Sequence, residues 1–206
     1  MSTGRFIVFE GGEGTGKSTQ AALLSESLDA LLTREPGGTA LGSRLRALLL
    51  GGPGGDGGAL IADRAEALLM AADRAQHAAE VLRPALSAGR DVVCDRYIPS
   101  TIAYQGAGRG LDASELARIS GWAADDLMPD LVVLLEVPDA VAWDRTGGAR
   151  DRIEAAGQDF HARVAASFRE QAAADPDRWV VLDGTGEVDD VRVRVLDAVR
   201  RRWPDR

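Results

Sequence analysis

Residues 5–24 read RFIVFEGGEGTGKSTQAALL: a short apolar run, a glycine-rich loop, and a segment with helical spacing. The loop, Gly11–Ser18, matches the pattern G-x-x-x-x-G-K-S/T in full, and it lies between an expected strand and an expected helix. Its four glycines let the backbone curl, so that several N–H groups can point at one phosphate beside the positive end of the helix dipole. We expect Lys17 to reach the β- and γ-phosphates of a nucleoside triphosphate and the Ser18 hydroxyl to ligate Mg²⁺. The residues expected to bind this nucleotide are Gly11, Gly12, Glu13, Gly14, Thr15, Gly16, Lys17, Ser18 and Thr19.

The length and composition are those of an ordinary globular protein. A chain of 206 residues, 45% hydrophobic and 27% charged, is expected to form one domain over residues 1–206. The net charge of −8 argues against a general nucleic-acid binder, although local cations can still hold a small phosphate ligand. The only cysteine, Cys94, lies in an apolar run, which favours a buried thiol and a reducing, cytoplasmic setting. No secretory signal is expected, and no apolar stretch approaches the ~20 residues that a membrane span needs.

Apolar runs alternate along the chain with longer segments of helical spacing. The expected strands are Arg5–Glu10, Leu31–Arg34, Asp91–Cys94, Leu131–Val137 and Trp179–Leu182. The expected helices are Lys17–Ala30, Ala40–Leu49, Ala59–Ser87, Ala113–Leu127, Ala140–Arg145, Gln158–Ala174 and Val188–Arg202. Because the strand runs are nearly continuous rather than alternating, they are typical of a parallel sheet that is buried on both faces. The order predicts an open α/β fold.

Two glycine-rich segments interrupt this pattern. Gly51–Gly58 reads GGPGGDGG, which favours a flexible surface loop rather than a domain linker. Gly147 and Gly148 fall within a charged stretch, and this combination suits a mobile lid over about residues 145–154.

Asp95-Arg96-Tyr97 ends the third apolar run. An acidic residue at the end of a strand in a phosphate-loop protein is the expected second ligand of Mg²⁺, which makes Asp95 the partner of Ser18. Arg96 would then lie where donor and acceptor phosphates meet. Glu13 would repel a triphosphate, so we expect its carboxylate to point to a neighbouring site, such as a sugar hydroxyl or a second cation.

Four segments together resemble the bacterial thymidylate kinase family. They are FEGGEGTGKST (Phe9–Thr19), TREPGGT (Thr33–Thr39), DRYIPSTIAYQG (Asp95–Gly106) and DRIE (Asp151–Glu154). The last three are not general features of phosphate-loop proteins, they occur in the family's order, and the resemblance covers essentially the whole chain. It implies a five-stranded parallel sheet with helices on both faces, a short lid, and transfer of the γ-phosphoryl group of ATP to dTMP with Mg²⁺. It also implies a homodimer.

The resemblance assigns a role to each matching position. Arg46 and Arg96 would hold the dTMP phosphate, and Glu13 would lie near the acceptor sugar. Tyr104 would lie under the deoxyribose and leave no room for a 2′-hydroxyl. The residues expected to read the thymine edge are Arg74, Thr101 and Gln105. Lid arginines would close over the transferring phosphoryl group, with Arg150 and Arg152 as the catalytic candidates beside Lys17 and Arg96.

Residue spacing supports the acceptor site, with some departures from the family. Met70 and Arg74 are four apart on an expected helix and share a face, and Thr101, Tyr104 and Gln105 are spaced to share another. Two such faces would form a slot for a thymine ring. Met70 stands where the family usually has a base-stacking Phe, and Pro99 stands where it commonly has Asp. The lid is short and carries few arginines.

Among these arginines, Arg145 ends an expected helix, so it is expected to be anchored at the base of the lid. Arg152 has an acidic neighbour that could hold it. Arg150 follows the glycines and is expected to move furthest, which makes it the favoured candidate for the transferring phosphoryl group.

Other functions remain open at this point. A regulatory GTPase is disfavoured because the sequence has no Asn for a guanine-reading N-K-x-D segment. The alternatives are a phosphate-loop kinase for another nucleoside monophosphate or a deoxynucleoside, and a non-catalytic nucleotide-binding regulator. His77 and His161 have no partners at metal-ligand spacing, and each is expected to lie on a helix surface.

Overall fold

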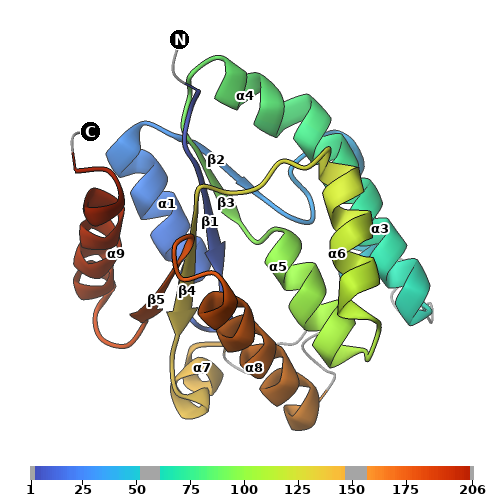
Figure 1. Cartoon of the computed structure of the whole chain (residues 1–206). Coiled ribbons are helices and arrows are strands. Elements are labelled where there is room, and N and C mark those ends of the chain that lie inside the picture. Colours follow the sequence, from blue (N-terminus) through green and yellow to red (C-terminus); the bar gives the residue numbers. More distant parts are fainter. Residues whose placement is uncertain (1–2, 52–60, 147–156, 205–206) are drawn as a thin grey trace.

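The computed structural model describes residues 3–51, 61–146 and 157–204. Its centre is a parallel sheet of five strands in the order β2-β3-β1-β4-β5 (Figure 1). The strands are β1 (Phe6–Glu10), β2 (Leu31–Arg34), β3 (Val92–Asp95), β4 (Leu131–Glu136) and β5 (Trp179–Asp183). All five expected strands are present, with ends shifted by at most one residue, and the α/β fold class is confirmed.

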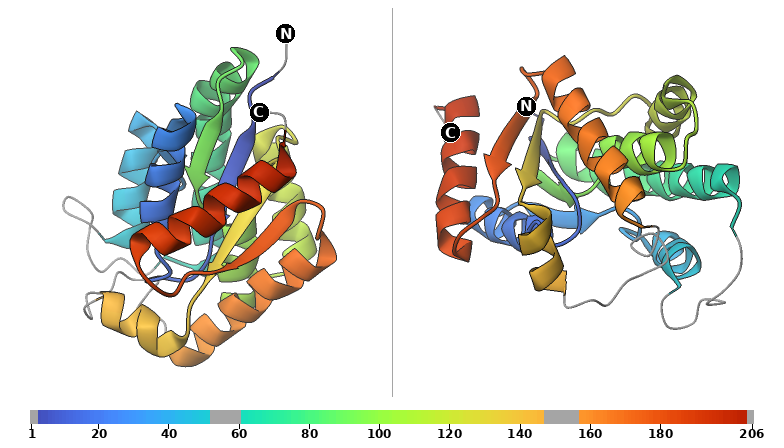
Figure 2. Two further views of the ribbon diagram at one scale, coloured as in Figure 1. Left: turned by 90° about the vertical axis from the view of Figure 1, so that its left-hand side faces the viewer. Right: turned by 90° about the horizontal axis from the view of Figure 1, so that it is seen from below.

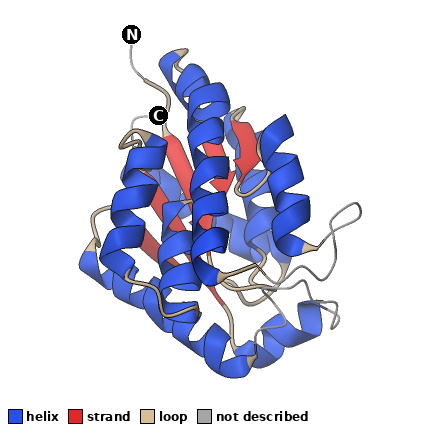
Figure 3. Cartoon of the chain, turned by 90° about the vertical axis from the view of Figure 1, so that its right-hand side faces the viewer, coloured by secondary structure: helices blue, strands red, loops and turns tan. Residues whose placement is uncertain are grey.

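The central strand β1 is buried on both faces, and its side chains alternate between two cores. Ile7 and Phe9 pack in one core with residues of α1 (Lys17–Leu28) and α9 (Val188–Arg202). Phe6 and Val8 pack in the other, with Cys94 and helical residues from the far side of the sheet. Figure 2 (left) looks onto the face that α1 and α9 cover, and Figure 3 looks onto the opposite face. The expected buried thiol of Cys94 is confirmed.

Several of the remaining helices cover the opposite face of the sheet. In chain order the further helices are α2 (Ala40–Leu50), α3 (Asp63–His77), the π-helical turn η1 (Ala78–Leu82), α4 (Arg83–Ser87), α5 (Ile98–Thr101), the π-helical turn η2 (Ile102–Gly108), α6 (Ala113–Ala124), α7 (Asp139–Thr146) and α8 (Gln158–Ala174). In the described parts of the chain, no helix is long and apolar enough to cross a membrane.

Several helix boundaries differ from the expected ones for local reasons. The segment expected as one helix over Ala59–Ser87 is helical from Asp63, with a π-helical turn between α3 and α4. Helix α6 stops at Ala124 because Asp125 and Asp126 adopt left-handed φ angles of 52° and 56°. The helical stretch Ile98–Gly108 was not among the expected helices, since its proline and glycines are more typical of a loop.

The parallel register brings the carboxyl ends of the strands to one edge of the sheet. Phe9 of β1 is opposite Asp95 of β3, and Arg34 of β2 is opposite Asp95 from the other side. The phosphate loop, the Asp95–Tyr97 segment and the Thr33–Thr39 segment therefore meet at this edge, where ligands of open α/β sheets bind. Gly51–Gly58 lies outside the described residues except for Gly51.

Helix α8 holds η2 in place through an aromatic cluster. Phe168 is 1% exposed and packs edge-on against Tyr104, with ring centroids 6.1 Å apart. We expect Phe168→Ala to lower the free energy of unfolding by about 3–5 kcal/mol, because it leaves a cavity in this core. Chemical denaturation measures the loss, and Val193→Ala, on an exposed face of α9, should change stability by no more than about 0.5 kcal/mol. A loss of under 1 kcal/mol for Phe168→Ala would contradict this packing.

Candidate active site

The glycines of the phosphate loop are required by close backbone approach. Gly11 and Gly14 have φ angles of 142° and 70°, and a Cβ atom on them would lie 2.5 Å from Leu135 O and 2.4 Å from Ala142 O. The loop delivers Lys17 to the start of α1, where its Nζ donates to Gly12 O at 3.0 Å. Lys17 is 5% exposed, and this burial lowers the pKa of its ammonium group.

Two oxygen ligands for a hard cation meet beside the loop. Ser18 Oγ donates to Asp95 Oδ2 at 2.5 Å, and both residues line a cavity of about 480 Å³ with Lys17 and Arg96. The other carboxylate oxygen, Asp95 Oδ1, is buried without a hydrogen-bond partner among the described residues. A hydroxyl and a carboxylate that lacks one partner fit Mg²⁺, which prefers oxygen ligands and keeps several waters. The described residues contain no cluster of three His, Cys, Asp or Glu that could hold a metal ion.

Arg96 joins the phosphate loop to a second cavity. Its guanidinium donates to Gly11 O at 3.1 Å and Ser100 Oγ at 3.2 Å, forms an ion pair with Glu13, and lies 4.9 Å from the centre of the Tyr104 ring. Burial alone would raise the pKa of Glu13, but Arg96 and Lys17 hold it at about 2, so this carboxylate is ionised. Glu13 also pairs with Lys17 at 3.6 Å and lines both the phosphate-loop cavity and the second cavity, so the expectation that it points away from the triphosphate stays a prediction.

Glu10, at the end of β1, binds the segment that follows Arg96. Its carboxyl group is fully buried and accepts hydrogen bonds from Tyr97 N at 2.9 Å, Ser100 N at 3.2 Å and Ser100 Oγ at 2.6 Å. Burial raises the pKa of Glu10 to about 7. Sequence reasoning missed this residue, although its position directly before the phosphate loop was a usable signal.

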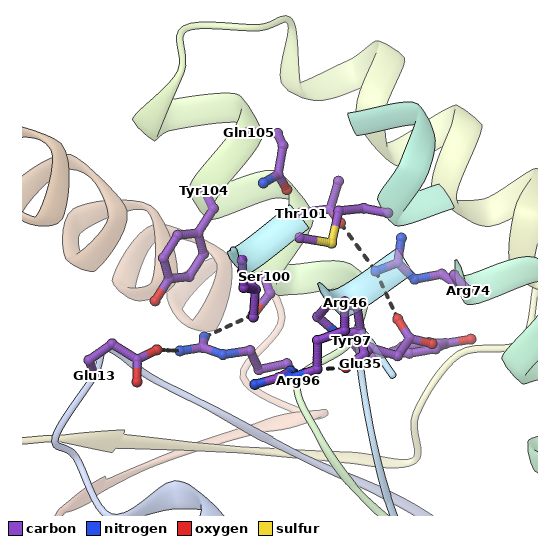
Figure 4. Close-up of a pocket in the computed structure, with 13 residues that line it drawn as sticks. Glu13, Glu35, Arg46, Arg74, Arg96, Tyr97, Ser100, Thr101, Tyr104 and Gln105 are labelled. Carbon is purple, nitrogen blue, oxygen red and sulfur yellow. Dashed lines mark hydrogen bonds and ion pairs between the residues drawn. The ribbon is translucent and has the colours of Figure 1, made fainter. Parts of the chain in front are cut away.

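The second cavity, of about 110 Å³, lies between α3 and the α5–η2 stretch (Figure 4). Every residue expected to bind the acceptor substrate lines it: Glu13, Arg46, Met70, Arg74, Arg96, Thr101, Tyr104 and Gln105. The structure therefore brings this set together, while the role of each residue stays a prediction. Figure 4 shows Arg74 and Thr101 joined by a hydrogen bond, which measures 3.1 Å.

The walls of this cavity combine apolar contacts with fixed polar groups. Met70 is half-buried and packs beside the aromatic cluster of Tyr104. Gln105 is 1% exposed, and its Nε2 donates to Glu66 Oε1 at 2.8 Å. Arg46 Nη1 donates to Pro36 O at 3.0 Å, which places this arginine beside the Thr33–Thr39 segment.

The expectation that His77 lies on a helix surface is wrong. His77 is 0% exposed, and both ring nitrogens are hydrogen-bonded: Nδ1 is 2.9 Å from Glu35 Oε1, and Nε2 is 2.7 Å from Thr33 Oγ1. It lies three residues after Arg74 on the inner face of α3, and Glu35 also pairs with Arg74 at 2.9 Å. Glu35 lies within the TREPGGT segment, but the sequence predicted no role for it. His161 is half-buried on α8 and contacts the Phe160 ring edge-on.

Of the expected lid, only residues 145 and 146 are described. Arg145 donates to Gly184 O at 3.0 Å and to Gly14 O and Gly186 O at 3.4 Å, so its guanidinium is tied to the phosphate loop and the segment after β5. This contact agrees with the expected anchoring of Arg145 at the base of the lid. Arg150 and Arg152, with Gly147, Gly148 and the DRIE segment, lie outside the described residues.

Comparisons with known proteins point to one family. A family model described as Thymidylate kinase matches residues 9–195. The chain is 48% identical to the thymidylate kinase of Cutibacterium acnes over 204 residues, which cover 97% of this chain and 96% of that protein. It is 52% identical to that of Clavibacter sepedonicus over 189 residues, covering 88% and 87%. A solved structure of thymidylate kinase from Ehrlichia chaffeensis superposes with a TM-score of 0.76 at 32% identity, covering 96% of this chain and 99% of that one. Since the family model and relatives near half identity extend over most of its length, this chain belongs to the thymidylate kinase family.

Proposed function

We propose that the described residues carry out the family's reaction, transfer of the γ-phosphoryl group of ATP to dTMP, in the roles set out below. The chain is a dTMP kinase that uses ATP and Mg²⁺. The observation that carries the assignment of roles is that two cavities share lining residues: Glu13 and Arg96 line both the phosphate-loop cavity and the acceptor cavity. A phosphate bound in either cavity would therefore lie beside the same guanidinium.

Catalysis at this site consists of positioning and charge neutralisation. The acceptor phosphate is already ionised at neutral pH, so no strong protein base is needed. Lys17 binds the β- and γ-phosphates from the loop side, and Arg96, with Arg46 nearby, orients the acceptor phosphate. Ser18 and Asp95 would hold Mg²⁺, which supplies positive charge to the phosphate oxygens when it is bound. Arg150 is our candidate for an arginine that contacts the transferring group, with Arg152 as the alternative.

The acceptor cavity offers a hydrogen-bonding pattern that suits thymine. Because Gln105 Nε2 already donates to Glu66, its amide oxygen is the atom left to accept from the N3–H of the base. Arg74 carries only donors and suits the O4 acceptor. Cytosine presents an amino group in place of O4 and lacks the N3–H, so both contacts would be lost. Met70 contacts the face of the ring, where a thioether sulfur gives about 0.3–1.5 kcal/mol.

We also propose a homodimer and a cytoplasmic location. Leu68 on α3 and Trp122 on α6 are 58% and 82% exposed, which is unusual for side chains of this size. The two helices pack against each other, with Arg74 Nη1 donating to Ser120 Oγ at 3.2 Å, so a second copy of the chain could cover both residues together. The cytoplasmic location is supported by the single, free and buried cysteine.

Lys17→Ala tests the catalytic assignment. We expect kcat for dTMP with ATP to fall by about 10²–10³-fold or more, because a preorganised cation at the transferring phosphate is lost. A coupled assay measures turnover with dTMP, dUMP, ribo-TMP, dCMP and thymidine, and the parent should prefer dTMP. Circular dichroism confirms that the variant is folded. Near-parental turnover of Lys17→Ala would reject the role of this loop in catalysis.

Tyr104 is predicted to exclude the ribose 2′-hydroxyl by its bulk. The parent should prefer dTMP over ribo-TMP by up to about 10²-fold, the scale on which an added hydroxyl is rejected by an apolar pocket. Tyr104→Phe should keep this preference in kcat/KM because the ring remains, whereas Tyr104→Ala should reduce it toward unity. Equal discrimination by the alanine variant and the parent would show that another group excludes the hydroxyl.

Light scattering coupled to gel filtration tests the dimer. The parent should have twice the mass of one chain, and Leu68→Glu combined with Trp122→Glu should give the mass of one chain, because two carboxylates would be buried in the interface. Val193→Glu, which changes an exposed apolar residue on α9, is the matched control and should leave the dimer intact. A parent that elutes as a monomer at micromolar concentration would refute the proposal.

A further inference from the structure

The Thr33–Thr39 segment, which has no role in the reaction as described so far, wraps around the inner face of α3. Glu35 follows β2 and is 4% exposed. Its Oε2 lies 2.9 Å from Arg74 Nη2, and its Oε1 lies 2.9 Å from His77 Nδ1. His77 Nε2 in turn lies 2.7 Å from Thr33 Oγ1. A continuous polar chain therefore runs from Thr33 through His77 and Glu35 to Arg74. Figure 4 shows the last two of these residues, Glu35 and Arg74, where they line the acceptor cavity.

The direction of these hydrogen bonds follows from the chemistry of the groups. The carboxylate of Glu35, beside the Arg74 guanidinium, can only accept, so His77 Nδ1–H is the donor to it. Thr33 can either donate to Nε2 or accept from it, because a hydroxyl does both. Every arrangement that satisfies Glu35 thus uses His77 as a donor, and this bond fixes where the carboxylate points.

The segment fits too closely against α3 for these side chains to rearrange. A Cβ atom on Gly38 would lie 2.6 Å from two atoms of the His77 ring and 2.8 Å from Thr33 Oγ1. Gly37 N also donates to Asp73 Oδ1 at 3.0 Å, which binds the segment to the same helix. The imidazole of His77 is therefore held in one orientation by backbone as well as by hydrogen bonds.

Arg74 receives its orientation from three separate parts of the fold. In addition to Glu35, Thr101 on α5 and Ser120 on α6 accept from its guanidinium at 3.1 and 3.2 Å, and the Tyr97 ring lies 5.3 Å from it. Of these partners only Glu35 carries a formal negative charge. Without it, a cation that is 2% exposed would lose its closest counter-charge.

We propose that Glu35 and His77 form a positioning pair that holds the Arg74 guanidinium toward the acceptor base, and so sets the choice of a 4-oxo over a 4-amino pyrimidine. This inference rests on the proposed role of Arg74 at the base edge. His77 does not line the cavity, so it acts on the substrate only through Glu35 and Arg74. A donor held in place strengthens binding of dTMP through O4 and weakens binding of dCMP, whose amino group is also a donor. A guanidinium that can turn away would discriminate less between the two nucleotides.

The test compares two replacements of His77 in the full-length enzyme. His77→Leu removes the donor to Glu35, while His77→Asn places an amide N–H near the position of Nδ1 and can restore it. Gln76→Leu is the matched control on the same helix, since Gln76 bonds only Glu80 at the surface among the contacts described. Steady-state kinetics with dTMP and dCMP give KM and kcat for each enzyme, calorimetry gives the dTMP affinity, and thermal melting reports stability.

We expect His77→Leu to raise the KM and Kd for dTMP by about tenfold, the equivalent of one charge-assisted contact that has lost its orientation. The KM for ATP and the kcat at saturating dTMP should stay within about twofold, because the phosphate loop is untouched. The ratio of kcat/KM for dTMP over dCMP should fall by about tenfold. His77→Asn should recover most of the affinity and selectivity, and Glu35→Gln, which keeps the shape but removes the charge, should resemble His77→Leu.

Three outcomes would overturn the proposal. The first is a folded His77→Leu enzyme with parental dTMP affinity and selectivity. The second is an equal loss in His77→Leu and His77→Asn that follows their melting temperatures, which would make the pair a support of the fold only. The third is a loss of kcat with an unchanged KM for dTMP. A parent that fails to phosphorylate dTMP would instead refute the proposed function, so the two failures are distinguishable.

Discussion

The ion pair between Arg96 and Glu13 joins the two halves of the active site. Glu13 belongs to the phosphate loop after β1, and Arg96 follows β3, so the pair closes the edge of the sheet between neighbouring strands. Arg96 adopts a φ of 71°, a conformation that costs a non-glycine residue about 1–3 kcal/mol. Gly11 O and Ser100 Oγ accept from its guanidinium, while buried Glu10 accepts from the backbone on its far side at Tyr97 and Ser100. These bonds offset the strain and keep the guanidinium between the phosphate-loop cavity and the acceptor cavity.

The sequence predicts most of the fold because its strongest signals are local. Continuous apolar runs identify four of the five strands, the weaker run Leu31–Arg34 follows mainly from its position, and the glycine pattern of Gly11–Ser18 identifies the loop that follows the first strand. The stretch Ile98–Gly108 is different: Pro99 and its glycines suggest a loop, but packing against α8 and α6 makes it helical. Here tertiary contacts override the local preference, since Phe168 and Phe160 bury the Tyr104 side of the stretch.

Eight of the residues that line the acceptor cavity could be predicted from helical spacing and family resemblance, but Glu35, which also lines it, and His77 behind it could not. His77 shows no metal-ligand spacing and reads as a surface histidine, because its partners, Thr33 and Glu35, lie more than 40 residues earlier in the chain. Glu35 presented no pattern of its own. Buried ion pairs are set by three-dimensional proximity across β2 and α3, and no periodicity within one segment encodes them. Burial and, next, the charge of Glu35 raise the pKa of neighbouring Asp73 to about 6, which reflects how crowded this cluster of charges is.

Burying such a cluster of charges costs free energy of folding. The positions of the buried carboxylates indicate which function that cost serves. Two of the three side chains expected to read the base each contact a buried carboxylate: Glu35 pairs with Arg74, and Glu66, which is 0% exposed, accepts from Gln105. The second contact matters because an amide can turn over. With its Nε2 bound to Glu66, Gln105 presents an oxygen, whereas the opposite orientation would bring two oxygens together and present a donor to the base. The two carboxylates therefore determine which atoms of the cavity donate and which accept. Replacing them by apolar groups could increase stability, as it does for some buried ion pairs, but the cavity would lose the fixed pattern of donors and acceptors that we propose distinguishes thymine from cytosine.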